Sequence, residues 1–257
     1  MAILIENMVL PHSQLRIPRW SAPRQGLYGI VGPNGSGKSQ FFSVLMRTLK
    51  PRLGKVSIEN CRIGCVMQHP EHQLTEATVR DEMLWPFSRK QQVDHRFQNQ
   101  LADVIQRWDL EVHWQQSPWT LSTGQKRRLI LAVYDLLNPD VLLLDEPSEG
   151  LDGEWKKRLA TWLTTRAGTR LTLITSHDWP WLLSFVGTGF WCEKTLDASP
   201  KDLGQLWYSH QLPTVNPLEQ LWRELLNRNA PVSWRGWIDA EVALGQVVTL
   251  WKSVQNQ

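Results

Sequence analysis

The chain has 257 residues, of which 42% are hydrophobic, and a formal net charge of +3. This length allows one substantial α/β domain plus an appendage. No apolar stretch approaches the roughly 18–20 residues that a membrane-spanning helix needs, and the net charge is too small to argue for nucleic acid by itself. Three cysteines (Cys61, Cys65 and Cys192) form no even disulfide framework and indicate a reducing cytosol.

The first predicted elements surround a glycine-rich loop. Residues 1–6 are expected to form a strand rather than a signal peptide. Gly26–Val31 is predicted to be a short buried strand and residues 40–49 an amphipathic helix. Between them lies a match to the phosphate-binding pattern G-x-x-x-x-G-K-S/T, made of Gly32, Pro33, Asn34, Gly35, Ser36, Gly37, Lys38 and Ser39. In such a loop backbone N–H groups turn toward an anion, Lys38 reaches the β- and γ-phosphates of ATP, and Ser39 holds Mg²⁺.

The next segment changes from strands to helices. Residues 54–59 and 62–66 are predicted strands, and Gln68 follows the second of them. The pattern then becomes helical and polar over residues 78–85 and 91–108.

Two cysteines and two histidines in this part of the chain invite a second interpretation, a metal site. The four residues are Cys61, Cys65, His69 and His72. Their spacing matches no standard zinc pattern, and Cys65 falls inside a predicted buried strand, so the metal interpretation is disfavoured.

A third motif opens a long helix. The sequence of residues 121–125 is Leu-Ser-Thr-Gly-Gln, and Ser122 is expected to cap a helix that runs to about Leu137 and stops at residues 138–139. A basic run follows the motif, Lys-Arg-Arg at residues 126–128. Its side chains are expected to face a partner's phosphates or simply solvent, as most such runs do.

The apolar run at residues 141–144 is of the kind buried on both faces of a parallel sheet. It ends in Asp145 and Glu146, at the strand end where open α/β sheets bind ligands. Asp145 is suited to hold Mg²⁺ through water, and Glu146 to polarise an attacking water. A helix over residues 153–166 and a strand at Leu171–Thr175 follow.

These motifs, in this order and spacing, make the chain resemble the ATP-binding subunit of an ABC transporter. The resemblance covers residues 1–195 and implies an α/β fold of the P-loop NTPase type. That fold has a RecA-like core with an antiparallel β subdomain and a helical subdomain, and here a C-terminal extension is added. In this family two nucleotide-binding domains pair head to tail, so that Ser122, Gly124 and Gln125 of one cap the γ-phosphate held by the other.

The resemblance assigns roles to four further residues. Gln68 matches the glutamine that senses Mg²⁺ and contacts the membrane partner, and Asp152 matches the aspartate that crosses the dimer interface. His177 matches the histidine that contacts the γ-phosphate, which makes Glu146, His177 and Lys38 the expected catalytic residues. His12 falls at the position that stacks on adenine.

The sequence departs from the family pattern at three positions. Gln40 stands where a threonine usually follows the P-loop serine, so a side-chain contact to the α-phosphate is lost while the backbone contact remains. Residues 121–125 correspond to the signature motif of the family, and Thr123 replaces the first glycine of that motif. Glu149 replaces a small residue. None of these changes removes a group that hydrolysis requires, so we expect an active ATPase that uses ATP and Mg²⁺.

Four segments are expected. Residues 1–67 form the first part of the ATP-binding core, 68–137 the helical subdomain and 138–198 the second part of the core. Residues 199–257 form a C-terminal extension with helical patterns at 218–227 and 239–253. This extension is either a dimerisation or regulatory element or a pair of helices packed on the core of its own chain.

Residues 68–82 resemble one subgroup of ABC transporter ATPases in particular. Gln68, Pro70 and Glu71, and then Thr78 and Val79, follow the pattern found in the ATPases of energy-coupling factor transporters, which import micronutrients. There this segment docks a membrane component, so residues 68–85 are expected to bind an integral membrane subunit. Four acidic residues are expected to form the rim of that docking site: Glu71, Glu76, Asp81 and Glu82.

The same resemblance implies the remaining partners. A second ATPase subunit, either another copy or a paralogue, and a separate substrate-binding membrane protein are expected, with no nucleic acid. The chain would be a peripheral protein on the cytoplasmic face of the inner membrane. Two alternatives stay open: the ATPase of a conventional ABC importer or exporter, and a soluble ABC ATPase that acts on ribosomes or DNA.

Overall fold

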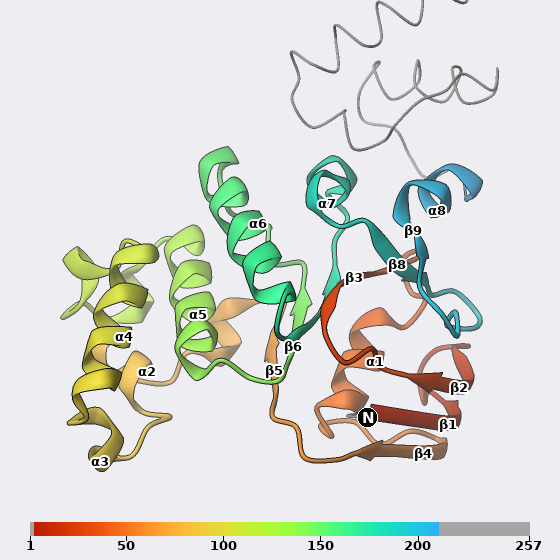
Figure 1. Cartoon of the computed structure of the whole chain (residues 1–257), viewed down its shortest axis with the longest axis horizontal. Helices are drawn as coiled ribbons and strands as arrows, with labels where there is room; N and C mark the ends of the chain where they lie inside the picture. The colour runs from red at the N-terminus through yellow and green to blue at the C-terminus, as the bar shows by residue number, and fades with distance from the viewer. Residues whose placement is uncertain (1–2, 211–257) are drawn as a thin grey trace, which may run out of the picture.

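The computed structural model describes residues 3–210, and the helical patterns at 218–227 and 239–253 lie outside these residues. Two sheets form the frame of the molecule (Figure 1). The smaller is antiparallel, with strands in the order β2 (Arg16–Ser21), β1 (Ile3–Val9) and β4 (Leu53–Ile58). The larger has six strands in the order β5 (Ile63–Val66), β6 (Val141–Asp145), β7 (Leu171–Thr175), β3 (Gly26–Val31), β8 (Thr188–Trp191) and β9 (Lys201–Asp202).

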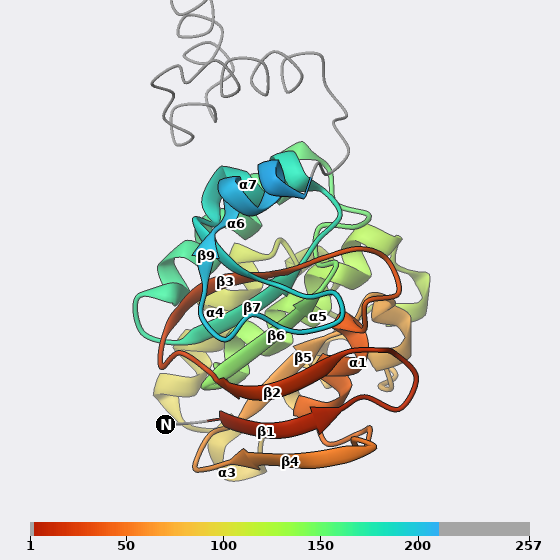
Figure 2. The same cartoon turned by 90° about the vertical axis from the view of Figure 1, so that its right-hand side faces the viewer.

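The first five strands of the larger sheet run parallel, and β9 pairs antiparallel with β8. Parallel strands are buried on both faces, and β6 shows how the two faces are filled. Leu142 and Leu144 belong to the core beneath the helices, whereas Val141 and Leu143 belong to the core beneath the smaller sheet. Helix α1 (Lys38–Leu45) lies between the two sheets (Figure 2).

The helical part projects from one end of the larger sheet (Figure 1). It contains α2 (Val79–Leu84), α3 (Arg89–Gln92), α4 (His95–Arg107) and α5 (Thr123–Leu137), with 3-10 turns at Pro70–Gln73, Glu111–His113 and Pro118–Thr120. The core continues through α6 (Gly153–Ala167), α7 (Trp179–Phe185) and α8 (Leu203–Ser209). The predicted fold class, an α/β core with an antiparallel sheet and a helical part, is confirmed.

Two helices differ from prediction, and local capping explains the first difference. The helix expected over residues 91–108 is divided, because the Asp94 carboxylate accepts hydrogen bonds from the N–H groups of Arg96 and Phe97 and starts a new helix there. The helix expected over 40–49 begins earlier, at Lys38, and ends at Leu45.

The first residues of the predicted C-terminal extension join the core. Strand β9 extends the larger sheet, and helix α8 buries Leu203, Leu206 and Trp207. The segment that begins at residue 199 is therefore continuous with the larger sheet and its helices as far as the structure describes it. Within the described residues no helix is long and apolar enough to cross a bilayer.

Candidate active site

The glycine-rich loop joins β3 to α1 in a conformation that requires glycine. Gly37 has a φ of 104°, in the left-handed region, and caps α1. A Cβ atom at Gly32 would lie 1.8 Å from the backbone oxygen of Cys192, on the neighbouring strand end. A side chain at either position would displace the loop, so both glycines are needed for this turn. The turn lies at the start of a helix, where the helix dipole favours an anion.

Lys38 is the first residue of α1, and its side chain reaches back over the loop. Its ammonium group donates hydrogen bonds to the backbone oxygens of Gly32 (2.9 Å) and Pro33 (3.0 Å). Burial lowers the pKa of Lys38, while nearby acidic groups that include Glu146 and Asp145 act in the opposite direction. The side chain thus presents a partly desolvated cation, suited to a phosphate.

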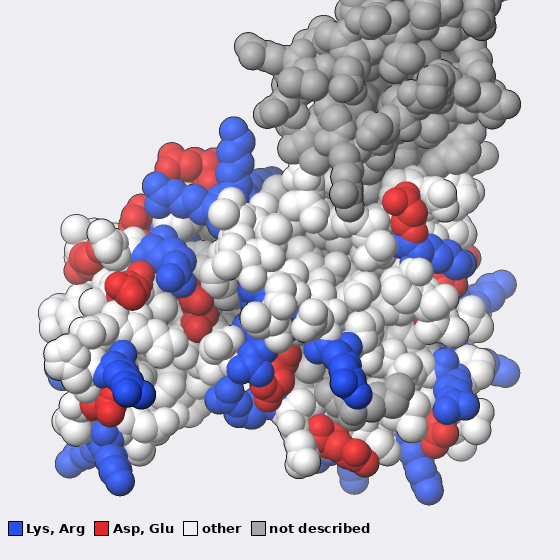
Figure 3. All heavy atoms as spheres, in the orientation of Figure 1, with Lys and Arg blue, Asp and Glu red and all other residues white. Residues whose placement is uncertain are grey.

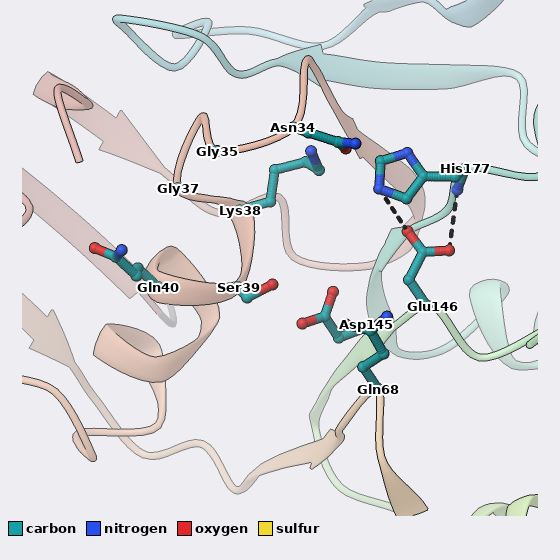
Figure 4. Close-up of a pocket in the computed structure, with 10 residues that line it drawn as sticks. All are labelled: Asn34, Gly35, Gly37, Lys38, Ser39, Gln40, Gln68, Asp145, Glu146 and His177. Carbon is teal, nitrogen blue, oxygen red and sulfur yellow. Dashed lines mark hydrogen bonds and ion pairs between the residues drawn. The ribbon is translucent and has the colours of Figure 1, made fainter. Parts of the chain in front are cut away.

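One open cavity of about 270 Å³ brings most of the predicted site residues together (Figure 4). Its lining comprises Asn34, Gly35, Gly37, Lys38, Ser39, Gln40, Gln68, Asp145, Glu146 and His177. These residues come from four separated parts of the chain: the loop before α1, the end of β5, the end of β6 and the segment after β7. The carboxyl ends of parallel strands meet here, as in other open α/β sheets.

Oxygen atoms suited to Mg²⁺ meet on one side of the cavity. The side chains of Ser39 and Asp145 point toward one another (Figure 4). The Thr175 hydroxyl donates a 2.6 Å hydrogen bond to Asp145 Oδ1, which fixes the carboxylate. Mg²⁺ prefers oxygen ligands and binds through one or two carboxylates plus substrate phosphates, so Ser39, Asp145 and the amide oxygen of Gln68 fit this ion.

Glu146 directly follows Asp145 and is held by the segment that carries His177. Its Oε2 accepts a 3.0 Å hydrogen bond from the backbone N–H of His177, and Oε1 is 3.5 Å from His177 Nε2. Glu146 has a φ of 52°, and its own N–H donates to the Thr175 backbone oxygen at 3.2 Å. Burial raises the pKa of Glu146, an effect that the His177 N–H partly offsets. A desolvated, oriented carboxylate of this kind can accept a proton from water.

Two predicted nucleotide contacts lie at the edge of the site. The side chain of Gln40 points away from Lys38 (Figure 4), and its Oε1 is buried without a hydrogen-bond partner among the described residues. His12 is exposed on the loop between β1 and β2 and does not line the cavity. The same loop adjoins the P-loop, because a Cβ at Gly37 would lie 2.6 Å from Ser13 Oγ.

The signature residues lie outside the cavity of their own chain. Ser122 caps α5 as predicted: its hydroxyl accepts from the Gln125 N–H, and the Gln125 side chain accepts from the Ser122 N–H. A Cβ at Gly124 would lie 2.8 Å from the Gly150 backbone oxygen, so the signature packs on the turn before Asp152. Asp152 caps α6. None of Ser122, Gly124, Gln125 and Asp152 lines the cavity.

The basic run at residues 126–128 is not a solvated helix face, and that expectation is wrong for two of its residues. Arg127 is 1% exposed and Arg128 is 9% exposed. Helix α5 packs against α2, α4 and the 3-10 turn at Pro70–Gln73, and its arginines donate to backbone oxygens of other segments. The unbroken apolar run at residues 129–133, directly after them, is the sequence signal that this helix is buried on most sides.

The predicted acidic rim also needs a correction. Glu82 is 1% exposed, and its carboxylate accepts hydrogen bonds from the N–H groups of Thr75 and Glu76, each at 2.9 Å. It closes the turn before α2 and cannot face a partner. Asp81 is half-buried and accepts a 2.6 Å hydrogen bond from the Thr78 hydroxyl.

The disfavoured metal site finds no support in the geometry. No cluster of three or more His, Cys, Asp or Glu side chains within residues 3–210 is arranged to hold a metal ion. Burial raises the pKa of Cys65 to about 12, which disfavours the thiolate form of this side chain.

Comparisons with known proteins agree with this geometry. The ABC transporter family profile matches residues 15–149. A Bacillus subtilis (strain 168) protein named for HMP/thiamine import, the ATP-binding protein YkoD, is 33% identical over 198 residues, which cover 70% of this chain and 35% of YkoD. The energy-coupling factor transporter ATP-binding protein EcfA2 of Staphylococcus aureus (strain USA300) is 34% identical over 180 residues, 59% of each chain. The chain thus spans between about a third and three fifths of the length of these relatives.

Solved structures share the fold. CbiO1 from Clostridium perfringens, part of the ABC transporter complex CbiONQ, matches with a TM-score of 0.66 at 21% identity, over 86% of this chain and 94% of that one. The dimeric ABC cassette MJ0796, solved with ADP and Pi, matches with a TM-score of 0.65 at 19% identity, over 78% of this chain and 98% of that one. With the family profile covering more than half of the chain, the conclusion is direct: this protein belongs to the ABC transporter ATPase family.

Proposed function

We propose that this chain binds ATP with Mg²⁺ and hydrolyses it to power a membrane transporter, of the energy-coupling factor type that imports a micronutrient. The observation that carries the ATPase is the cavity of Figure 4. There a phosphate-binding loop with Lys38 lies opposite a carboxylate, Glu146, which the His177 N–H orients.

Each side chain then has one task. Lys38 and the loop N–H groups hold the β- and γ-phosphates. Mg²⁺, when bound by Ser39, Asp145 and Gln68, neutralises charge on those phosphates. Glu146 accepts the proton of the attacking water, and His177 contacts the γ-phosphate from the same side. Because Glu146 is largely buried, its interaction with that water acts in a weakly screened environment.

A second ATPase subunit completes the site. Ser122, Gly124 and Gln125 begin a capped helix, whose N–H groups favour an anion, yet they lie outside their own cavity. In a head-to-tail pair, either of two copies or of this chain and a paralogue, these residues cap the γ-phosphate bound by the other subunit. Asp152, on the turn against which Gly124 packs, would lie at the same interface.

The transporter assignment depends on residues 68–85 and on the names of relatives. This segment begins with Gln68 in the cavity and ends at Trp85, whose side chain is 60% exposed, so it joins the nucleotide site to the surface. We propose that it docks an integral membrane subunit, with a separate membrane protein binding the cargo. The chain would then be peripheral on the cytoplasmic face of the membrane.

The rival activities have less support. An ATPase acting on ribosomes or DNA would need a basic surface for the phosphate backbone, and on the face shown in Figure 3 basic and acidic side chains are interspersed. A conventional ABC importer or exporter would use the same cavity, and only its membrane partner would differ.

Two experiments test the proposal. Glu146→Gln keeps the hydrogen-bond acceptor but not the base, so we expect ATP binding to persist while hydrolysis falls at least about a hundredfold. Glu154→Gln, at an exposed carboxylate on α6, is the control and should hydrolyse at the wild-type rate. Hydrolysis retained in the Glu146 variant would disprove the assignment of the base.

Co-purification tests the partners. The tagged chain is extracted in mild detergent, and its companions are identified by mass spectrometry. One membrane scaffold plus a small separate binding protein is the expected result. A soluble complex or ribosomes would refute transport and leave the ATPase assignment intact.

A further inference from the structure

Arg127 connects the signature helix to the segment that carries Gln68. Its guanidinium group donates to the backbone oxygen of Met67 at 2.7 Å and to the backbone oxygen of Gln68. These two residues directly follow β5, and the side chain of Gln68 reaches the nucleotide cavity (Figure 4). One buried side chain on α5 therefore holds the backbone from which this cavity residue projects.

The other hydrogen-bonding groups of this segment are fixed by its own turn. The Met67 N–H donates a 2.8 Å hydrogen bond to the Gln73 side-chain oxygen, and the Gln73 amide donates to the Cys65 backbone oxygen, also at 2.8 Å. Gln73 thus ties this backbone to the 3-10 turn that follows, and its amide also donates to the Tyr134 hydroxyl on α5 at 3.3 Å. Arg127 makes the direct connection, because among the described residues only its guanidinium group joins the Met67 and Gln68 backbone oxygens to α5 by hydrogen bonds.

Arg127 is not explained by stability alone. Its Nε is buried without a hydrogen-bond partner among the described residues, and a buried unpaired donor destabilises a fold. Burial lowers the pKa of Arg127, and four carboxylates oppose this effect, the largest contribution coming from Glu149. The others are Glu71, Glu146 and Asp145. The charge therefore lies between the Gln68 segment and the turn that precedes Asp152.

We infer that Arg127 is a positioning residue for ATP hydrolysis, which acts by fixing Gln68 relative to the signature helix of the same chain. This inference rests on the proposed function. Because α5 is a continuous helix that starts at the signature, any movement of its first turns is passed to the Gln68 backbone through two charge-assisted hydrogen bonds. Arg127 does not line the nucleotide cavity, and its hydrogen bonds among the described residues go to Met67 and Gln68 and not to the P-loop, so nucleotide binding itself should change little.

Arg128 provides a matched control. It is the next residue on α5 and is also buried, but its guanidinium donates to the Trp108 backbone oxygen at 3.0 Å and lies 4.3 Å from the Trp155 ring centre. It makes no hydrogen bond to residues 67–68. Replacing either arginine by methionine keeps a side chain of similar length and removes a buried charge, so the two variants lose comparable packing but different partners.

A double-mutant cycle on the purified chain tests the inference. We expect Arg127→Met to lower kcat about tenfold, the cost of a hydrogen bond to a charged group, with KM for ATP within about twofold of wild type. In a Gln68→Ala background the same change should lower kcat less than about twofold, because Gln68 is then no longer there to be positioned. Arg128→Met should lower kcat by the same factor in both backgrounds. An equal loss for Arg127→Met in both backgrounds would overturn the inference.

A measurement without catalysis separates this inference from the proposed function. Deuterium uptake of the peptide that spans residues 64–74 should rise in Arg127→Met and remain at the wild-type level in Arg128→Met. Unchanged uptake in Arg127→Met would refute the positioning role whether or not the chain hydrolyses ATP. If wild type hydrolyses no faster than Glu146→Gln, the proposed function fails, and the uptake result still decides the link. Should Arg127→Met not fold, Arg127→Lys, which keeps the charge but offers one nitrogen to two carbonyls, replaces it in both experiments.

Discussion

Removing the Asp135 carboxylate should destabilise the junction between the helical part and the core. Asp135 lies on α5, with a side chain only 12% exposed, and accepts hydrogen bonds from three donors on other helices. The indole N–H groups of Trp108, at the end of α4, and Trp162, on α6, donate at 3.0 Å and 2.8 Å. Arg107, on α4, supplies the third. One carboxylate therefore joins α4, α5 and α6.

The expected loss for Asp135→Ala follows from these partners. Each indole left unpaired costs about 1–3 kcal/mol, whereas Arg107 is about half exposed and regains water, so its contribution is small. The free energy of unfolding should fall by about 3 kcal/mol, equivalent to roughly 6–12 °C in Tm for a domain of this size. Urea titration followed by tryptophan fluorescence measures it. Asp103→Ala, at an exposed carboxylate on α4, should change stability by less than about 0.5 kcal/mol.

A second substitution tests the cause. Trp162→Phe removes one donor and part of a ring, and in an Asp135→Ala background the donor has already lost its acceptor. The substitution should therefore cost about 1–2 kcal/mol less in that background than in wild type. An identical cost in both backgrounds would refute the hydrogen-bond explanation and leave ring packing as the whole effect.

Substitutions at three further residues have defined outcomes. Glu82→Ala leaves the Thr75 and Glu76 N–H groups unpaired and should lower the free energy of unfolding by about 2–3 kcal/mol, with Glu82→Gln losing less because one acceptor oxygen remains. Gln40→Thr removes a buried unpaired oxygen and supplies a hydroxyl near the loop, so KM for ATP should fall by about threefold or more; an unchanged KM would contradict this. Burial raises the pKa of Glu146, so its protonated form stabilises the fold below the unfolded-state pKa and that contribution is lost as pH rises through the folded-state pKa. Glu146→Gln should therefore raise Tm at about pH 8 and give a smaller gain at about pH 5. A gain in Tm that does not depend on pH would contradict the explanation that burial of the Glu146 carboxylate destabilises its charged form.

The elements predicted with the correct bounds are those whose information is local. Strands Gly26–Val31 and Leu171–Thr175, and the end of α5 near Leu137, are found where the sequence places them. Both strands are short apolar runs, and a helix-stopping pair at residues 138–139 directly follows α5. The cavity residues were predictable for the same reason, because each follows a buried strand, and parallel strands end at one edge of a sheet.

The buried charges could not be located from the sequence. Arg127, Arg128 and Glu82 have the composition of surface residues, and what buries them is the backbone of segments far away along the chain or in an irregular turn. A buried charge needs partners, and a sequence pattern shows the charge but not the carbonyl or N–H that pairs with it. For the two arginines the apolar run after them was the available signal.

The sequence contains 15 tryptophans, and the structure shows at three positions why tryptophan is present and not another apolar residue. The indole N–H groups of Trp108 and Trp162 donate to Asp135, and that of Trp181 donates to the Lys156 backbone oxygen at 2.9 Å. Leucine would fill similar space without that donor. These residues fasten helices of the core to one another, a role that depends on tertiary contacts and not on any pattern along the chain.

The contacts of α5 bear on how two half-sites could act together. At its start, Gly124 packs on the turn before Asp152, so the two segments proposed to face a second subunit are in contact with each other. Less than one turn further along, Arg127 holds the backbone of Gln68, which lines the nucleotide cavity of the same chain. A partner that shifts the signature therefore moves a residue of this chain's own site, and the reverse also holds, because coupling between two sites is reciprocal. On this reasoning α5 carries a signal between the signature and Gln68 within each subunit, and weakening Arg127 should reduce the coupling between half-sites before it reduces the affinity of either for nucleotide.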